Sequence, residues 1–560
     1  MQRRMYIVMS LGLLFFSALV GRLFYFQIVN GEDIARRAAA MRNRSVEFLE
    51  YTRGDILDRN LLPLTGENST WAVYGFPHLI LDDDKGKKIA DSLMASVGQQ
   101  DFQTMLHKLA AAQNTGQSMV RIASHIDRDE AEKITAQGLP GVVAAPMQKR
   151  YREDGFAVHL IGYVRNDSEA RGQSGLEAVY DQILRGQTGL PELISVQDAR
   201  GEAIQGLMFK LQREERQRSR VVTTIDRRIQ ELAEKSMNQR VKKGAVVVMD
   251  INNKEILAMA SRPAFNPYDL SAAMLEQENT PFINRALEGY NPGSLFKMMV
   301  SIAAIEENTV SFGDRFDCPG FYQFDDSFTM NCWKEEGHGS ITFEEAFANS
   351  CNPSFIEIGL TLGREKLNQH VKAVHLTDQQ IIGYSIPSAQ CYVNIDGGEK
   401  ALANACLGQL GVKLSPLQIA SLVSTIVDNG KWSPPVLVRY VTDQQGKQDN
   451  ATRPDKQQVM QEQTAEKLQY LLKKTVADGT GKSAAISSAQ VAGKTATSQT
   501  GRENEEGEEI LNTWFTGYLP AQHPKWAIVV MIEEGISGSQ SAAPVFREIS
   551  EGILQYYSAH

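Results

Sequence analysis

A serine and a lysine three positions apart are the residues of this chain best suited to covalent catalysis. They are Ser294 and Lys297, in the run Gly-Tyr-Asn-Pro-Gly-Ser-Leu-Phe-Lys at residues 289–297. A serine hydroxyl is a weak nucleophile at neutral pH and needs a neighbouring base. In a helix the two side chains share one face, and a desolvated ammonium group loses its proton more readily. The pair therefore predicts an activated serine, although its spacing alone is common in helices.

Two later segments complete a set of three motifs. Ser350-Cys-Asn352 stands in Ala-Asn-Ser-Cys-Asn-Pro, and Lys494-Thr-Ala-Thr497 stands in Val-Ala-Gly-Lys-Thr-Ala-Thr-Ser. Taken singly, Ser350 and Asn352 could cap a helix or shape a turn, and Lys494 could be a surface lysine. The order Ser-x-x-Lys, Ser-x-Asn, Lys-Thr-Gly is typical of penicillin-recognising acyl-serine enzymes. By these motifs the chain resembles the class B penicillin-binding proteins, which are peptidoglycan D,D-transpeptidases.

The resemblance implies acyl transfer in two steps without a cofactor for the chemistry. Ser294 attacks the carbonyl of the penultimate D-alanine of a stem peptide while Lys297 takes the hydroxyl proton. D-Alanine leaves, and an amine of a neighbouring stem peptide then resolves the acyl-enzyme. Ser350 is expected to return a proton to the leaving nitrogen. Asn352 is expected to hold the substrate amide and to contact Lys297.

The third motif is expected to bind the substrate carboxylate. Lys494 supplies positive charge near Ser350, and Thr495 and Thr497 donate hydroxyl hydrogen bonds to the carboxylate. The backbone N–H groups of Ser294 and Thr497 are expected to form the oxyanion hole. Ala496 departs from the family, which usually has glycine there. Because glycine permits close approach to a strand, we expect weakened acylation by β-lactams with peptide transfer retained.

Three cysteines and a histidine between the first two motifs have side chains that suit zinc. They are Cys318, Cys332, His338 and Cys351. Three thiolates and an imidazole form a common structural zinc set, and some elongation-type and sporulation-type relatives look similar here. A disulfide between Cys318 and Cys332, or buried free thiols, are the alternatives, and Asp317 or Asp326 could replace Cys318 as a ligand. Cys391 and Cys406 lie outside this cluster and are expected to be buried.

An apolar run near the N-terminus predicts a single membrane anchor. It extends from residue 5 to 21, is interrupted by Arg22, and continues from 23 to 29. This length can span a bilayer, and we identify no convincing cleavage site for a signal peptide. Basic residues on both sides, among them Arg36 and Arg37, weaken an orientation argument from charge. A catalytic domain outside the cytoplasm, with the protein in the cell membrane, is implied by the resemblance.

The rest of the chain predicts two further modules. Arg53-Gly-Asp-Ile-Leu-Asp-Arg-Asn60 resembles the start of the non-catalytic module of class B proteins, as do later motifs around Tyr151 and Glu177. We interpret the charged side chains of the first motif as an ion network rather than a binding site. The expected domains are an anchor at 1–30, an elongated pedestal module of the dimerisation type at 31–220, and a transpeptidase domain at 221–560.

Hydrophobic periodicity predicts an α+β fold for the last domain. Residues 221–226 read as a strand and 227–235 as a helix, followed by a hairpin over 244–260. Two more strands begin at Trp514 and Trp526, and residues 542–556 read as a closing helix. The acidic stretch 502–509 is expected to be a solvated loop between strands. We therefore expect both ends of the domain to share one central antiparallel sheet flanked by helices.

Other functions are less consistent with the sequence. A net charge of −9 argues against nucleic acid as a substrate. A β-lactamase or a D,D-carboxypeptidase of the same superfamily is the alternative enzyme. A β-lactamase would normally be secreted or compact, without the large module before residue 220, and it would need a deacylating base that we do not identify. A β-lactam sensor would carry several membrane spans. The resemblance also implies peptidoglycan stem peptides and β-lactams as ligands, the cytoplasmic membrane as a surface, and a polytopic glycosyltransferase as a scaffolded partner.

Overall fold

The computed structural model divides the chain into two compact units, which are described separately. It describes residues 2–30, 43–47, 53–66, 68–81, 107, 109–114, 119–139, 141–165, 171–185, 192–196, 209–212, 219–276, 278–385, 391–443 and 445–558. The first unit comprises residues 1–52, 68–149 and 187–216, and the second comprises 53–67, 150–186 and 217–560. The second unit thus includes two segments from before residue 220, so the domain boundaries drawn from the sequence stay a prediction.

The N-terminal apolar run forms one long helix. Helix α1 (Gln2–Phe24) continues into the π-helical turn η1 (Tyr25–Val29). The stretch Ile7–Val29 has a mean hydropathy of 2.1, and none of it is buried against other parts of the chain. By length and composition this helix fits a single-pass membrane protein. Arg36 and Arg37, which bear on its orientation, lie outside the described residues.

The first unit also contains two small antiparallel sheets. One has the order β4-β3-β5, and helix α6 (Arg128–Ala136) packs against it. Val73, Ile122 and Ile134 belong to the small core of this sheet. The other has the order β1-β6-β7. The remaining elements of the unit are β1 (Asn43–Glu47), β3 (Asn68–Gly75), α3 (Pro77–Ile80), β4 (Val120–Ile126), β5 (Val142–Lys149), β6 (Glu192–Val196) and β7 (Phe209–Gln212).

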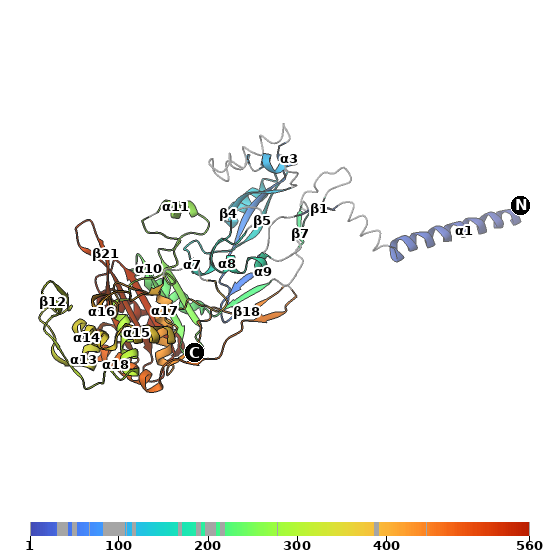
Figure 1. Cartoon of the computed structure of the whole chain (residues 1–560). Helices are drawn as coiled ribbons and strands as arrows, with labels where there is room; N and C mark the ends of the chain where they lie inside the picture. The colour runs from blue at the N-terminus through green and yellow to red at the C-terminus, as the bar shows by residue number, and fades with distance from the viewer. Residues whose placement is uncertain are drawn as a thin grey trace. The chain divides into compact units, whose positions relative to one another are not determined.

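A five-stranded antiparallel sheet organises the second unit. Its order is β10-β9-β23-β22-β21, so early strands of the unit pair with its last ones, as the green and red ribbons show (Figure 1). The strands are β9 (Gly244–Asp250), β10 (Ile256–Arg262), β21 (Ala492–Glu503), β22 (Glu509–Leu519) and β23 (Trp526–Glu533). This confirms the predicted α+β fold with both ends of the domain in one sheet. Most of the acidic stretch, residues 504–508, forms the exposed turn between β21 and β22, as predicted, whereas residues 502–503 and 509 belong to the two strands.

Both faces of this sheet are buried. Alternate residues of β9 point to opposite faces, so Val246 and Val248 lie in one core cluster while Val247 and Met249 lie in another. Helices α10 (Arg227–Arg240) and α19 (Ala543–Ser558) pack on each other and on the first face. Helix α17 (Pro416–Val427) contacts β9, β22 and β23 from the other side. A sheet covered on both faces makes a rigid support for residues at its edge strand, β21.

The remaining elements of the second unit surround this core. Those that carry or support site residues are η2 (Gly293–Leu295), α12 (Phe296–Glu306), α13 (Phe343–Ala348), α14 (Asn352–Leu362) and α18 (Glu462–Ala477). The others are β2 (Asp55–Leu57), α7 (Val158–Ile161), α8 (Gly175–Val179), α9 (Asp181–Arg185), β8 (Arg220–Thr223), α11 (Leu270–Leu275), β11 (Arg315–Cys318), β12 (Phe321–Asp325), β13 (Phe328–Asn331), β14 (Gly339–Thr342), α15 (Arg364–Ala373), β15 (Tyr392–Val393), α16 (Glu399–Cys406), β16 (Val412–Lys413), β17 (Lys431–Trp432), β18 (Val438–Thr442), β19 (Gln448–Asn450), β20 (Gln457–Gln458), η3 (Lys482–Ala484) and η4 (Gly538–Ala542).

A buried ion network ties early segments into the second unit. Glu177 is fully buried and accepts hydrogen bonds from Arg53 Nε at 2.9 Å, from Arg150 Nε, and from the Tyr151 hydroxyl at 2.9 Å. Asp58, which the sequence placed in this network, instead accepts backbone N–H groups, including that of Leu62 at 2.8 Å. The network interpretation is therefore confirmed for Arg53, while Asp58 shapes a turn.

Replacing Glu177 by glutamine is expected to lower the free energy of unfolding by about 3–5 kcal/mol, because Arg53 and Arg150 lose their shared buried counter-charge. Chemical unfolding monitored by circular dichroism measures this. Glu132→Gln is the control, since Glu132 pairs with Arg128 on an exposed helix face, where solvent screens the pair and its loss should change stability little. Equal stability of the two variants would contradict the assigned role.

Candidate active site

Ser294 lies in a tight turn at the start of a buried helix. The turn η2 leads into α12, whose residues from Phe296 to Ile305 are all buried. Gly293 precedes the serine with φ of 54° and accommodates the backbone of β21, since a Cβ there would lie 2.9 Å from the Thr497 carbonyl oxygen. The Gly293 N–H donates to the Gly408 carbonyl at 2.9 Å. The serine is thus held between the edge strand and a second loop.

Lys297 reaches the second motif through three contacts. Its Nζ donates to the Ser350 carbonyl oxygen at 2.8 Å, to Asn352 Oδ1 at 2.8 Å, and to Ser350 Oγ at 3.4 Å. The side chain is fully buried, and burial lowers the pKa of Lys297 from 10.5 to about 8, an effect that the nearby side chains of Cys351, Cys332 and Cys318 partly oppose. Such an amine is neutral in an appreciable fraction near physiological pH.

Ser350 connects Lys297 to Ser294. Its Oγ donates to Ser294 Oγ at 2.7 Å. It follows α13 and precedes α14, and its φ of 57° lies in the left-handed region that residues with a Cβ rarely adopt. This backbone conformation costs energy that the surrounding contacts must offset. The geometry therefore joins Ser294, Ser350, Lys297 and Asn352 in one set of contacts.

Lys494 is a buried cation without a hydrogen-bond partner in the part of the chain that the structure describes. Its side chain is fully buried in β21, and its Nζ lies 5.7 Å from the centre of the Phe347 ring. Burial, together with the charge of Lys297, holds the pKa of Lys494 well below its usual value. A desolvated ammonium group of this kind would be stabilised by an anion.

The other residues of the third motif lie next to Lys494 along the same strand. Thr497 Oγ1 accepts a hydrogen bond from the Gly538 backbone at 3.2 Å. Thr495 is mostly buried, and its Oγ1 lies 2.7 Å from Thr480 Oγ1. Ala496 is buried and belongs to the main core cluster, so its methyl group is accommodated by packing. The weakened reaction with β-lactams that we expect from Ala496 stays a prediction.

Sequence patterns did not point to Thr480. It stands in Asp-Gly-Thr-Gly, residues 478–481, directly after α18. Its N–H donates to the carbonyl of Ala348, at the end of α13. A helix followed by glycine and threonine is a common C-terminal signal, so the composition alone indicates only a turn. The contact with Thr495 depends on how α18 packs against β21.

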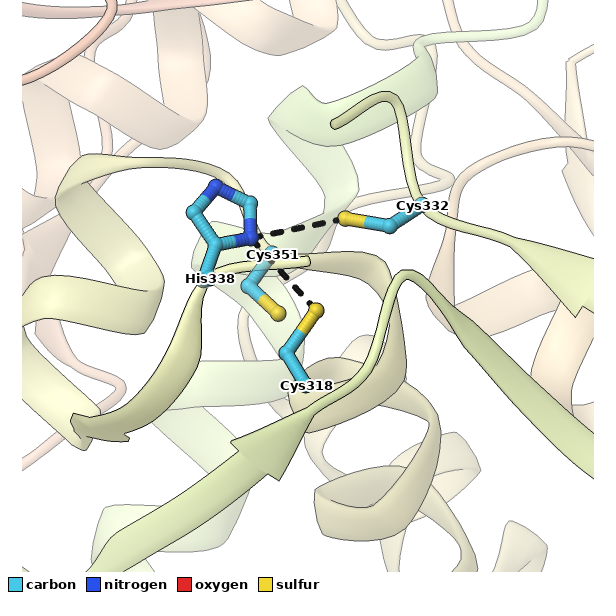
Figure 2. A group of neighbouring side chains, drawn as sticks. All are labelled: Cys318, Cys332, His338 and Cys351. Atoms are coloured by element: carbon cyan, nitrogen blue, oxygen red, sulfur yellow. Dashed lines mark hydrogen bonds between the residues drawn. The ribbon is translucent and has the colours of Figure 1, made fainter. Parts of the chain in front are cut away.

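The three cysteines and the histidine converge as the sequence suggested. Figure 2 shows Cys318, Cys332, His338 and Cys351 pointing toward one another, and their candidate ligand atoms all lie within 4.8 Å of each other. His338 Nδ1 is 3.5 Å from the Cys318 sulfur and 3.6 Å from the Cys332 sulfur.

These four residues come from separate segments around the second motif. Cys318 ends β11, Cys332 follows β13, and His338 precedes β14. Cys351 is the N-cap of α14, between Ser350 and Asn352. All five cysteines are free thiols in the structure, and Cys391 and Cys406 lie outside the cluster. Cys406 is buried as expected, whereas Cys391 is only half-buried.

Comparison with known proteins places this geometry in a family. The protein-family model of the penicillin binding protein transpeptidase domain matches residues 244–551. The family model of the penicillin-binding protein dimerisation domain matches residues 49–212. Stage V sporulation protein D of Bacillus subtilis is 29% identical over 99% of this chain and 85% of its own length. Peptidoglycan D,D-transpeptidase MrdA of Haemophilus influenzae is 26% identical over 98% of this chain and 91% of its own.

A solved structure shares the fold. The crystal structure of the D,D-transpeptidase domain of a peptidoglycan glycosyltransferase from Eggerthella lenta superposes with a TM-score of 0.63 at 22% identity. The match covers 91% of this chain and 99% of the other. Together with the two matched domains, these findings show that the chain belongs to the class B penicillin-binding proteins, which pair a dimerisation domain with a penicillin-binding transpeptidase domain.

Proposed function

We propose that Ser294 is the acylated nucleophile of this chain, which as a class B penicillin-binding protein is a serine-type peptidoglycan D,D-transpeptidase that cross-links cell wall and binds β-lactams. The observation that supports this assignment most is the set of contacts from Lys297 through Ser350 to Ser294, held in a buried site. A serine, a base and a connecting hydroxyl in this order are what covalent acyl transfer requires.

Ser350 serves as the proton relay in this proposal. The contacts seen are those of charged Lys297, which donates to Ser350 Oγ, while Ser350 Oγ donates to Ser294 Oγ. With Lys297 neutral, both hydroxyl groups turn, so that Ser294 donates to Ser350 and Ser350 donates to Lys297 Nζ. The Ser294 proton then passes to Ser350 Oγ as the carbonyl is attacked, and the Ser350 proton passes to Lys297. The reverse path returns a proton to the departing D-alanine nitrogen. The sequence had assigned the first transfer to Lys297 directly. We propose the relay in addition to direct transfer, because among the described residues the hydrogen bond to Ser294 Oγ comes from Ser350 Oγ.

The third motif binds the substrate carboxylate and backbone. Lys494 offers a buried positive charge, and the hydroxyl groups of Thr495 and Thr497 are the neighbouring donors. Strand β21 lies at the edge of the five-stranded sheet, so an extended stem peptide can pair with it as an additional strand. The Ser294 and Thr497 N–H groups then stabilise the oxyanion. Asn352 holds the substrate amide while it orients Lys297.

Structural zinc at the cysteine cluster fits the side chains present. Three sulfurs and one imidazole nitrogen suffice for a closed four-coordinate site, and their mutual distances are compatible with a single ion. Asp317 and Asp326 are exposed and are not part of this group. With Cys351 held between Ser350 and Asn352, the four side chains fix the second motif in position relative to Ser294. The ion takes no part in the acyl transfer.

Helix α1 anchors the protein in the cell membrane, with the catalytic domain on the extracytoplasmic side. The substrate supports this orientation, because peptidoglycan is cross-linked outside the cytoplasmic membrane. We identify no glycosyltransferase motif, so glycan strands come from a partner enzyme, and a polytopic glycosyltransferase in the same membrane suits a single-pass anchor. Resemblance to the elongation-type and sporulation-type proteins supports a role in one of those processes.

Intact-mass spectrometry of the full chain in detergent tests the nucleophile. Incubation with a penicillin is expected to add one drug mass to the wild-type chain and none to Ser294→Ala. Ser301→Ala is the matched control, since that hydroxyl lies on the same helix and donates to the Lys297 carbonyl. Rapid drug turnover without an adduct would indicate a β-lactamase. An adduct on Ser294→Ala would place the nucleophile elsewhere.

The rate of penicillin acylation is expected to rise with pH toward a plateau above about pH 8. Lys297 must be neutral to accept a proton, and burial lowers its pKa to about 8. Between pH 7 and pH 9 the neutral fraction, and therefore the second-order rate constant, increases about tenfold. Stopped-flow measurement across this range provides the profile. A rate that does not change from pH 6 to pH 9 would show that Lys297 is not the base.

Elemental analysis is expected to find one zinc per purified chain. Cys332→Ser is expected to lose the metal and to lower both the melting temperature and the acylation rate, because the second motif is no longer fixed. Cys391→Ser is the matched control and keeps the metal, since Cys391 lies outside the cluster. Wild-type chain free of metal, with full activity unaffected by a chelator, would contradict structural zinc.

A further inference from the structure

Thr480 lies where the second and third motifs meet. The turn after α18 brings its N–H within 3.1 Å of the Ala348 carbonyl, two residues before Ser350. Its hydroxyl lies 2.7 Å from that of Thr495, the residue after Lys494. Both contacts come from one half-buried residue that belongs to neither motif. Thr480 therefore touches the segment of the relay serine with its backbone and the carboxylate-binding strand with its side chain.

The turn at residues 478–481 packs closely against the end of α13, and this fixes its backbone. A Cβ on Gly479 would lie 2.2 Å from the Ala348 carbonyl oxygen, so only glycine fits between the two backbones. The N–H groups of Gly479 and Gly481 both donate to the Thr475 carbonyl, at 3.1 and 3.0 Å. With its backbone fixed at these points, Thr480 presents its hydroxyl to Thr495 from a defined position.

A hydroxyl group donates only one hydrogen bond, which limits what Thr495 can do. If Thr495 donated to Thr480, it would have no proton left for a substrate carboxylate. If Thr480 donates, the Thr495 oxygen accepts and its own O–H is free to point at the carboxylate. A carboxylate only accepts hydrogen bonds, so its arrival near Lys494 favours the second arrangement.

We propose that Thr480 is a positioning residue for substrate recognition, donating a hydrogen bond to Thr495 so that the Thr495 hydroxyl is aimed at the substrate carboxylate. The inference rests on the proposed role of Thr495 in binding that carboxylate. Thr480 itself does not touch the substrate. Its effect is confined to ligands that carry the carboxylate, which separates it from a residue that merely stabilises the fold.

The test measures penicillin acylation of the full chain for Thr480→Val, Thr495→Val and the double variant. Thr480→Val is expected to lower the second-order rate constant about five- to tenfold, mainly through weaker binding before acylation. Thr495→Val is expected to lower it about ten- to a hundredfold, because a hydrogen bond to a charged group is lost. The double variant should match Thr495→Val, since Thr480 acts only through Thr495.

Two controls separate orientation from folding. Thr480→Ser keeps the hydroxyl and should react like wild type, whereas Thr361→Val removes an exposed hydroxyl bonded within its own helix and should have no effect. The methyl ester of the same penicillin lacks the carboxylate charge, so Thr480→Val and wild type should acylate with it at nearly equal rates. Thr480→Ala provides a second variant without the hydroxyl if the valine variant folds poorly, and thermal melting is recorded for every variant.

The measurements distinguish failure of the role inferred for Thr480 from failure of the proposed function. No effect of Thr495→Val would remove the carboxylate role of Thr495 and the inference with it. Thr495→Val could lower the rate constant as expected while the double variant shows the product of the two single losses. That result would overturn the role of Thr480 but leave the carboxylate role of Thr495 standing. Equal losses for Thr480→Ser and Thr480→Val, or an equal loss with the ester, would also overturn it, since packing would then explain the effect.

Discussion

The active site depends on keeping one ammonium group in a buried, partly desolvated position. Lys297 has no exposed surface, and its hydrogen bonds go to Ser350 and Asn352, which lie on a segment more than fifty residues further along the chain. Desolvation makes the neutral amine accessible near physiological pH. The same contacts fix where Ser350 lies relative to Ser294. The lowered pKa of Lys297 and the position of Ser350 next to Ser294 therefore arise from a single packing arrangement.

That arrangement requires support from several directions. The sheet supplies a rigid edge strand whose backbone closely approaches Gly293, so the turn that carries Ser294 and the strand that carries Lys494 share a boundary. Helix α18 contacts β21, α12 and α13 and thereby spans the elements that carry all three motifs. The left-handed conformation of Ser350 persists because both flanking helices are anchored. Cys351 adds a fixed point on the opposite side of the same segment.

Two buried lysines within one site create an electrostatic conflict in the absence of substrate. Burial disfavours the charged form of both Lys297 and Lys494, and the charge of Lys297 further lowers the pKa of Lys494. In the proposed function, a substrate carboxylate relieves this by pairing with Lys494. Binding of the carboxylate would then remove the free-energy cost of holding the buried charge of Lys494 close to Lys297. Part of the binding free energy would come from removing that cost.

Local sequence determined the elements and the chemistry, whereas tertiary packing determined the contacts between them. The continuous apolar run of β9, the Asp226 cap of α10 and the apolar run of α1 are short-range patterns, so the α+β fold and the membrane helix were predictable. The order of the three motifs likewise specified which residues meet. The hydrogen bond of Ser350 to Ser294, the turn formed by Asp58 and the contact of Thr480 with Thr495 were not predictable, because each depends on how separate elements pack or on a local backbone conformation. Periodicity reports which face of an element is buried, but it carries no information about which distant hydroxyl lies 2.7 Å away.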